Sequence, residues 1–231
     1  MNRRLWLVCS FGLAWVAWSV CSVASSEVDP TEDWVASSSV SLDGDQWLVA
    51  RDPDNVGRDE KWFAKPNQDA KRTYVPSIIQ QAFPRYHGVA WYWREFTAAA
   101  NPHPGGRYLL KFWSVDYLAD VWVNGVHVGA HEGGDGRFVL DATDAIKPGA
   151  ANLLSVRVLN PPVDQVIDGI VLGQTAHASK GVWLWNDGGI EGAVELLVVP
   201  SVWVEDVHIV PDPKSGDVAV HVSVHNSAQE T

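Results

Sequence analysis

Cysteine is almost absent from this chain of 231 residues, and its two copies, Cys9 and Cys21, both lie near the N-terminus. A domain formed by the residues after Cys21 therefore contains no thiol. This excludes disulfide bonds, thiol catalysis and cysteine-ligated metal from that part of the chain.

Positive charge is also scarce. The chain has 17 Lys and Arg against 28 Asp and Glu, a formal net charge of −11, and it contains no run of basic residues. A nucleic-acid or anionic-membrane surface needs basic clusters to neutralise phosphates. We therefore expect no nucleic-acid partner.

Apolar residues and tryptophan, in contrast, are plentiful. Hydrophobic residues make up 46% of the chain, and its 13 Trp outnumber the 5 Tyr and 6 Phe together. Such rings pack in cores or stack on flat ligands, and sugar rings are the first such ligand to consider. The composition indicates a folded domain and excludes a disordered tail.

Residues 1–26 are predicted to be a secretory signal peptide. Arg3 and Arg4 form a basic start, residues 5–20 are uncharged and mostly apolar, and residues 22–24 have the small-x-small pattern of a cleavage site. This predicts export to the periplasm or the cell exterior, with no membrane association after cleavage. An uncleaved anchor is the alternative, because a bilayer is crossed by ~20 apolar residues.

Period-two alternation of apolar and polar residues dominates from Glu27 onward and predicts β-strands. Asn124-Gly125 lies between two alternating runs and predicts a tight hairpin, because both turn positions need positive φ. The only helical signal is one turn over residues 143–147. The predicted strands cover residues 89–96, 108–113, 119–123, 126–129, 153–159, 192–199, 203–210 and 218–224.

Many short strands with no helical crossover predict an all-β fold, a jelly-roll (galactose-binding-like) β-sandwich over residues 27–199. Trp91 and Trp93 share one face of their strand and Tyr92 and Phe96 share the other, so this strand is predicted to be central in a sheet, with its rings mainly in the core. Residues 200–231 contain two more strands, too few to bury a core, and are predicted to begin a second, incomplete β domain.

Residues 160–187 form the longest stretch without a strand pattern, and loops of this length are usually functional or disordered. Near its end, aromatic rings and polar groups occur together in a combination that can hold a sugar ring. Packing of the two tryptophans against the core is an equal alternative. The candidate substrate-binding residues are His177, Trp183, Trp185, Asn186 and Asp187.

No catalytic residue is predicted. The acidic residues cluster in turns, where solvated turn-closing roles are expected, and there is no Gly-x-Ser-x-Gly or phosphate-loop motif. Residues 52–60 could supply calcium ligands, but Val56 occupies a position that needs oxygen, which favours a polar turn. His127, His131 and Glu132 could begin a zinc site, yet without a third positioned ligand structural histidines are favoured. We expect no metal and no cofactor.

Three segments resemble a known family. They are residues 86–96 (YHGVAWYWREF), 110–134 (LKFWSVDYLADVWVNGVHVGAHEGG) and 137–162 (RFVLDATDAIKPGAANLLSVRVLNPP). Together they are similar to the N-terminal sugar-binding domain of glycoside hydrolase family 2, which includes β-galactosidases, β-glucuronidases and β-mannosidases. The resemblance covers residues 44–199, and the strands after Val202 look like the start of the immunoglobulin-like domain that follows in this family.

The resemblance implies a retaining exo-β-glycosidase whose two catalytic glutamates lie on a later (β/α)₈ barrel, so this chain alone is expected to be inactive. Its implied partners are a β-glycoside and that barrel domain. Two features depart from the family: Gly189-Ile190 is not followed by the usual Trp-Arg, and Asp187 lies closer to Gly189 than the family's substrate-touching aspartate does. A free-standing carbohydrate-binding module and a non-functional fragment are the alternatives.

Overall fold

The computed structural model describes residues 4–9, 37–175 and 186–227, which fall into two compact units. The sandwich unit comprises residues 38–101 and 107–198. The hairpin unit contains residues 102–106 and the described residues before Ser38 and after Val198.

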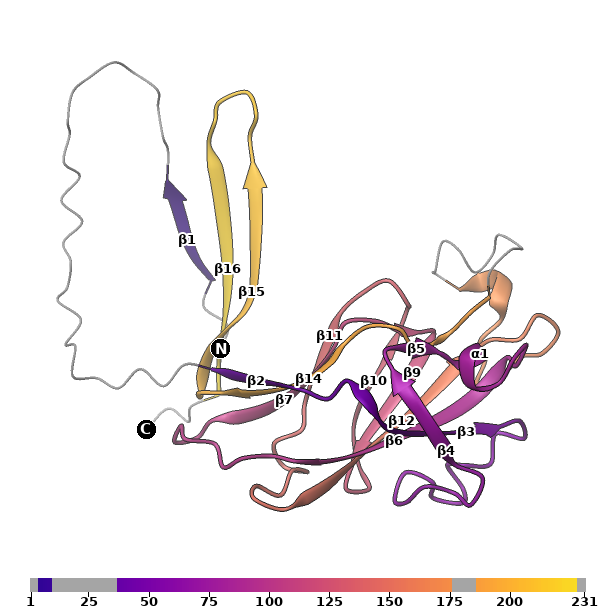
Figure 1. Ribbon diagram of the computed structural model, residues 1–231. Helices are drawn as coiled ribbons and strands as arrows, with labels where there is room; N and C mark the ends of the chain where they lie inside the picture. Colours follow the sequence, from indigo (N-terminus) through magenta and orange to yellow (C-terminus); the bar gives the residue numbers. More distant parts are fainter. Residues whose placement is uncertain (1–3, 10–36, 176–185, 228–231) are drawn as a thin grey trace, which may run out of the picture. The chain divides into compact units, whose positions relative to one another are not determined.

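Two antiparallel sheets form the sandwich unit (Figure 1). The six-stranded sheet has the order β10-β9-β12-β6-β3-β4, with strands β3 (Gly44–Asp52), β4 (Lys71–Val75), β6 (Gly88–Thr97), β9 (Leu118–Val123), β10 (Val126–Glu132) and β12 (Ala151–Asn160). The four-stranded sheet has the order β11-β7-β14-β2, with strands β2 (Ser38–Ser41), β7 (Arg107–Phe112), β11 (Phe138–Asp141) and β14 (Val194–Val199). This confirms the predicted all-β sandwich.

A small third sheet lies in the same unit. Its order is β5-β13-β8, formed by β5 (Ser77–Ile78), β13 (Gly189–Ile190) and β8 (Val115–Asp116). β13 pairs antiparallel with both neighbours, so this sheet fixes the point at which the long loop after β12 returns to the fold.

Strand β6 is central, as predicted, because it pairs with β12 on one side and β3 on the other. Its alternating side chains enter two separate apolar layers. Tyr92 and Phe96 belong to the main core, whereas Trp91 and Trp93 belong to a second cluster. Residues of segments 62–70 and 167–170 pack against that second cluster. We call the face of the six-stranded sheet that carries this cluster its outer face.

The β9–β10 hairpin turns at Asn124-Gly125, as predicted. Both residues have positive φ, 52° and 81° respectively, which is the conformation that a two-residue turn of this kind requires. The Asn124 side chain also donates to the Ala145 carbonyl at 2.8 Å, so the turn is fixed to the neighbouring loop.

The helical content differs from the expectation. Residues 143–147 form hydrogen-bonded turns and no helix, with Ile146 N donating to Ala142 O. Two short helices that the sequence did not predict occur instead, α1 (Ile79–Ala82) and the 3₁₀ helix η1 (Leu172–Gln174). A single turn is too short to produce a helical repeat of apolar residues, so sequence pattern does not detect it.

The hairpin unit contains β15 (Val202–Pro211) and β16 (Val218–Asn226), which pair antiparallel near the predicted positions. Val204, Val207 and Ile209 on β15 are 56%, 48% and 59% exposed. A further strand, β1 (Arg4–Cys9), pairs with the other edge of β16. β1 lies inside the predicted signal peptide, and export stays a prediction.

Candidate functional site

The loop between β12 and β13 is the candidate site. Of the five predicted substrate-binding residues, His177, Trp183 and Trp185 lie outside the described residues. Asn186 and Asp187 lie at the end of the loop, immediately before β13, and both are half-buried.

Two asparagines join the ends of this loop. Asn160, the last residue of β12, is fully buried and donates through Nδ2 to the Asn186 carbonyl at 2.9 Å. Asn186 in turn donates through Nδ2 to the Pro161 carbonyl at 2.8 Å. A side-chain amide can satisfy main-chain carbonyls that have left the regular ladder. We call this pair the loop neck.

The residues after the neck fit against β5 with no space for larger side chains. The Gly188 carbonyl accepts a hydrogen bond from Ile79 N at 2.6 Å. Gly189 has φ +151°, and a Cβ there would lie 2.6 Å from the Ser77 carbonyl oxygen. Only glycine permits this close backbone approach. The end of the loop that carries Asn186 and Asp187 is therefore fixed at this edge of the sandwich.

A second attachment holds the first third of the loop against the outer face of the six-stranded sheet. Asp168 lies in a tight turn between Ile167 and Ile170, with φ 51°. Its Oδ2 lies 2.7 Å from Arg157 Nη2 and 3.0 Å from Arg58 Nη1, and its Oδ1 accepts from Asn55 Nδ2 at 3.1 Å.

These contacts belong to a charge cluster of Arg58, Asp120, Arg157 and Asp168. Arg157 projects from the centre of β12, and its side chain is fully buried. Arg58 is also paired with Asp120, and Arg157 Nη1 lies 3.6 Å from Asp120 Oδ2. A buried guanidinium needs such partners because its desolvation is costly.

The two arginines lower the pKa of the Asp168 carboxyl. Burial acts to raise the pKa of its carboxyl, but the nearby charges of Arg157 and Arg58 outweigh burial and hold the pKa below the ordinary value. The carboxylate therefore stays ionised at neutral pH. A carboxylate held between two guanidinium groups is suited to fastening a loop and unsuited to donating a proton.

The histidines of β10 occupy separate surroundings. His127 lies edge-on to Trp122 and 3.6 Å from Asp120, whereas His131 stacks on Phe138 with a centroid distance of 4.3 Å. Within the described ranges, no three His, Cys, Asp or Glu side chains lie together as a metal site requires. The geometry favours structural histidines.

The predicted polar turn at residues 52–60 has an internal explanation. Asp52 is 1% exposed, and its carboxylate accepts from Val56 N at 2.8 Å, Gly57 N at 2.9 Å and Trp91 Nε1 at 2.9 Å. Its oxygens therefore close the turn and join it to the outer face of the sheet, which favours the turn over a calcium loop.

The comparison with known families agrees with this architecture. The family described as glycosyl hydrolases family 2, sugar binding domain, matches residues 40–200. The chain belongs to glycosyl hydrolase family 2. The match includes both sheets of the sandwich unit and the loop between β12 and β13, and it confirms the resemblance seen in the sequence.

Several proteins similar to this chain are β-glucuronidases. That of Paenibacillus borealis is 30% identical over 203 residues, covering 80% of this chain and 33% of that protein. That of Canis lupus familiaris is 26% identical over 195 residues, covering 74% of this chain and 30% of its own. The chain thus spans about a third of the length of the relatives it matches.

Solved structures show the same similarity. A β-glucuronidase from an uncultured Clostridium sp. has a TM-score of 0.64 and 28% identity over 86% of this chain and 35% of its own. The enzyme of Faecalibacterium prausnitzii has a TM-score of 0.60 and 29% identity over 77% of this chain and 34% of its own.

Sequence reasoning did not identify Asn160, Arg157 or Asp168 as residues that hold the loop. One signal was visible for Arg157, because a single arginine interrupts the apolar strand LLSVRVL. A charged residue at such a position needs a partner from elsewhere in the fold. Asp168 is one of many acidic residues in turns, and no sequence signal separates it from the others.

Proposed function

We propose that this chain is the N-terminal sugar-binding and scaffold part of an exported family 2 exo-β-glycosidase that hydrolyses β-glucuronides. The catalytic acid/base and nucleophile are glutamates of a barrel domain of the same enzyme, and the chain alone is inactive. The observation that supports this most directly is the loop neck, which holds Asn186 and Asp187 at a fixed edge of a family 2 sugar-binding domain.

The role assigned to the loop is substrate positioning. Asp187 and Asn186 supply polar groups, and His177, Trp183 and Trp185 supply further polar and aromatic groups to the sugar. Retaining hydrolysis needs two carboxyl groups ~5 Å apart with different pKa values. Asp120 and Asp168, the two carboxylates of the charge cluster, are instead held by arginines, which makes this pair unsuited to that role.

Expression of the protein encoded by the reading frame continued past Thr231 tests the proposal. We expect that product to hydrolyse an aryl β-glucuronide in preference to an aryl β-galactoside, and the purified 231-residue chain to hydrolyse neither. Hydrolysis by the 231-residue chain would overturn the assignment of catalysis to a barrel. A frame that stops at Thr231, together with sugar binding, would support a free-standing carbohydrate-binding module.

Loop variants in the longer product test the positioning role. We expect Asp187→Asn and Trp185→Ala each to lower kcat/KM by about tenfold, the effect of losing one good contact to the substrate. Asp164→Asn is the matched control, because Asp164 is an exposed carboxylate of the same loop. Unchanged kinetics in both loop variants would remove this role.

Export is the remaining part of the proposal and rests on the predicted signal at residues 1–26. N-terminal sequencing of the protein recovered from the periplasm or medium should begin near residue 27. The pairing of β1 with β16 requires residues 4–9 to stay on the chain. A protein that retains those residues would therefore contradict cleavage. Among the described residues, no helix has the length and apolar character needed to cross a membrane.

A further inference from the structure

Two histidines lie opposite each other on the β15–β16 hairpin (Figure 1). The antiparallel register pairs His208 of β15 directly with His221 of β16. Side chains at directly opposite positions project from the same face of a strand pair, with Cβ atoms ~4.5–5.5 Å apart. The two imidazole rings have centroids 5.9 Å apart and planes inclined at 48°. Both rings are therefore within reach of one common ligand.

The spacing of the two rings suits a shared transition-metal ion. Zn²⁺ binds an imidazole nitrogen at ~2.0–2.1 Å with tetrahedral angles, which puts the centroids of two such rings roughly 5 Å apart. The observed separation of 5.9 Å is only slightly larger. His208 is exposed and His221 is half-buried, and the χ2 torsion of histidine has a broad minimum. The pair can thus close on an ion by side-chain rotation, without movement of the strands.

The charges near the pair favour a cation. Asp206 lies two residues before His208 on β15, so it is on the same face, and it is exposed. Neither β15 nor β16 contains a lysine or an arginine. Arg4 of β1 is paired with Ser223 across the far edge of β16, whereas Asp206 is paired with Ser223 across the near edge. The carboxylate is thus on the strand that carries His208, where it attracts a cation.

The pairing of His208 with a second imidazole differs from the surroundings of other histidines. His225, on the same face of β16, stacks on Trp203 with centroids 4.2 Å apart. The histidines of β10 likewise lie against aromatic rings. An aromatic neighbour covers a ring face but adds no nitrogen ligand. His208 and His221 instead bring together two imidazoles, which are ligands that suit Zn²⁺, Cu²⁺ and Ni²⁺.

Two protein ligands make an exchangeable site and not a permanent one. Across residues 4–9, 37–175 and 186–227, no three His, Cys, Asp or Glu side chains form a group of metal ligands. Structural zinc sites usually have four protein ligands and catalytic sites three. At His208 and His221, water would therefore fill the remaining positions, and occupancy would follow the concentration of free metal.

We propose that His208 and His221 bind one divalent transition-metal ion of the imidazole-preferring class that includes Zn²⁺, and that this ion links β15 to β16. The two residues are separated by the hairpin turn and form no spacing motif, so only the strand register reveals the pair. An ion held by both strands binds the paired hairpin and not the separated strands, so it stabilises the hairpin. The proposal concerns the hairpin unit and is independent of the activity assigned to the family 2 domain.

Calorimetric titration of the untagged 231-residue chain with ZnCl₂ tests the proposal. Cys9→Ser and Cys21→Ser are present in every sample, because thiolates also bind zinc. We expect one Zn²⁺ per chain, with an affinity that excess CaCl₂ leaves unchanged, since Ca²⁺ prefers oxygen ligands. Absence of saturable binding at up to about 1 mM Zn²⁺ would overturn the proposal. Displacement of Zn²⁺ by Ca²⁺ would also overturn it, because carboxylates would then be the ligands.

Single substitutions locate the ligands. We expect H208Q and H221Q each to weaken Zn²⁺ binding at least about tenfold, since losing a ligand costs no less than losing a residue that orients one. H225Q is the matched control, because it removes an imidazole from the same face, where the ring stacks on Trp203, and it should bind normally. Equal weakening in all three variants, or no weakening in H208Q and H221Q, would overturn the proposal.

Amide hydrogen exchange tests whether the ion links the two strands. We expect Zn²⁺ to slow exchange along β15 and β16 in the starting protein and in H225Q, but not in H208Q or H221Q, because the ion opposes opening of the hairpin. Exchange without metal shows whether each variant still forms the hairpin, and if one does not, the variant on the opposite strand decides. Zinc binding with no slowing of exchange in the starting protein would overturn the proposal.

Discussion

Arg157 and Asp168 connect the centre of the six-stranded sheet to the loop that follows it, with Nη2 and Oδ2 separated by 2.7 Å. Arg157 is paired across the sheet with Trp91 on one side and Asp120 on the other. A fully buried cation beside an indole ring depends on carboxylates to compensate for lost hydration. Docking of the loop and stability of the sheet are therefore coupled through this ion pair.

Replacement of Asp168 should remove the coupling between loop docking and sheet stability. We expect Asp168→Asn to lower the free energy of unfolding by about 1–3 kcal/mol, because the charged partner of a buried arginine is lost. Urea unfolding followed by tryptophan fluorescence measures this. Asp164→Asn removes an exposed carboxylate from the same loop and should change stability by less than about 0.5 kcal/mol. Equal effects of the two substitutions would contradict the coupling.

The contribution of Asp168 should also depend on pH. Its pKa is lower in the folded protein than the ordinary value of 3.8. Its stabilising contribution is therefore fully present above that value and is lost as pH falls through the lower, folded-state pKa. We expect the stability difference between wild type and Asp168→Asn to be constant from about pH 7 to pH 5 and to shrink below about pH 4. A difference that grows on acidification would show the opposite pKa shift.

The substitution Asn160→Ala tests whether the loop neck anchors the loop. Loss of the buried amide leaves the Asn186 carbonyl without its donor, and we expect a cost of about 1–3 kcal/mol together with faster proteolytic cleavage between residues 161 and 188. Asn67→Ala is a suitable control, because Asn67 only closes an exposed turn at Asp69. The neck would have no anchoring role if limited proteolysis cut both variants at the wild-type rate.

Close packing at Gly57 predicts a further large effect. A Cβ at this position would lie 2.3 Å from Trp91 Nε1 and 2.8 Å from Asp52 Oδ2. Trp91 and Asp52 are buried and hydrogen-bonded to each other, so moving either side chain costs free energy. We expect Gly57→Ala to destabilise the protein by about 1–3 kcal/mol. Gly136→Ala, which has open space around it, should be neutral or slightly stabilising, and a thermal unfolding series compares the two.

The sheets were predictable from the sequence because they depend on local patterns. Alternation along residues 89–96 predicts the two faces of β6, and Asn124-Gly125 predicts the turn before β10 by its required φ values. These signals lie within a few residues of the structure they specify. The resemblance to glycoside hydrolase family 2 identified the type of domain that these strands form.

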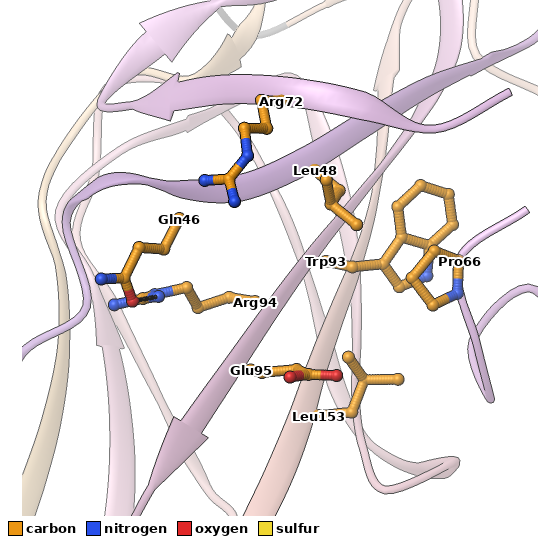
Figure 2. A pocket seen from close by; sticks show the side chains of 8 residues that line it. All are labelled: Gln46, Leu48, Pro66, Arg72, Trp93, Arg94, Glu95 and Leu153. Carbon is orange, nitrogen blue, oxygen red and sulfur yellow. Dashed lines mark hydrogen bonds between the residues drawn. The ribbon is translucent and has the colours of Figure 1, made fainter.

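The connections that hold the candidate site were not predictable in this way. Arg157 and Asn55 are 102 residues apart in sequence, and Asp168 contacts Arg58 across 110 residues. Aspartate is common in turns, so no local sequence feature identifies Asp168 as the partner of a buried arginine. The row that Arg72, Leu48 and Trp93 form on the outer face (Figure 2) depends on the register of three strands, which sequence alternation alone does not determine.

The loop neck fixes the two ends of the loop to the sandwich. Asn160 and Asn186 satisfy main-chain carbonyls at the two points where the chain leaves and rejoins the fold, so side chains outside residues 176–185 fix both of these points. We therefore expect both points to persist when the length or composition of that stretch is changed. A protein engineer could therefore replace the stretch between these two asparagines with the corresponding stretch of a relative.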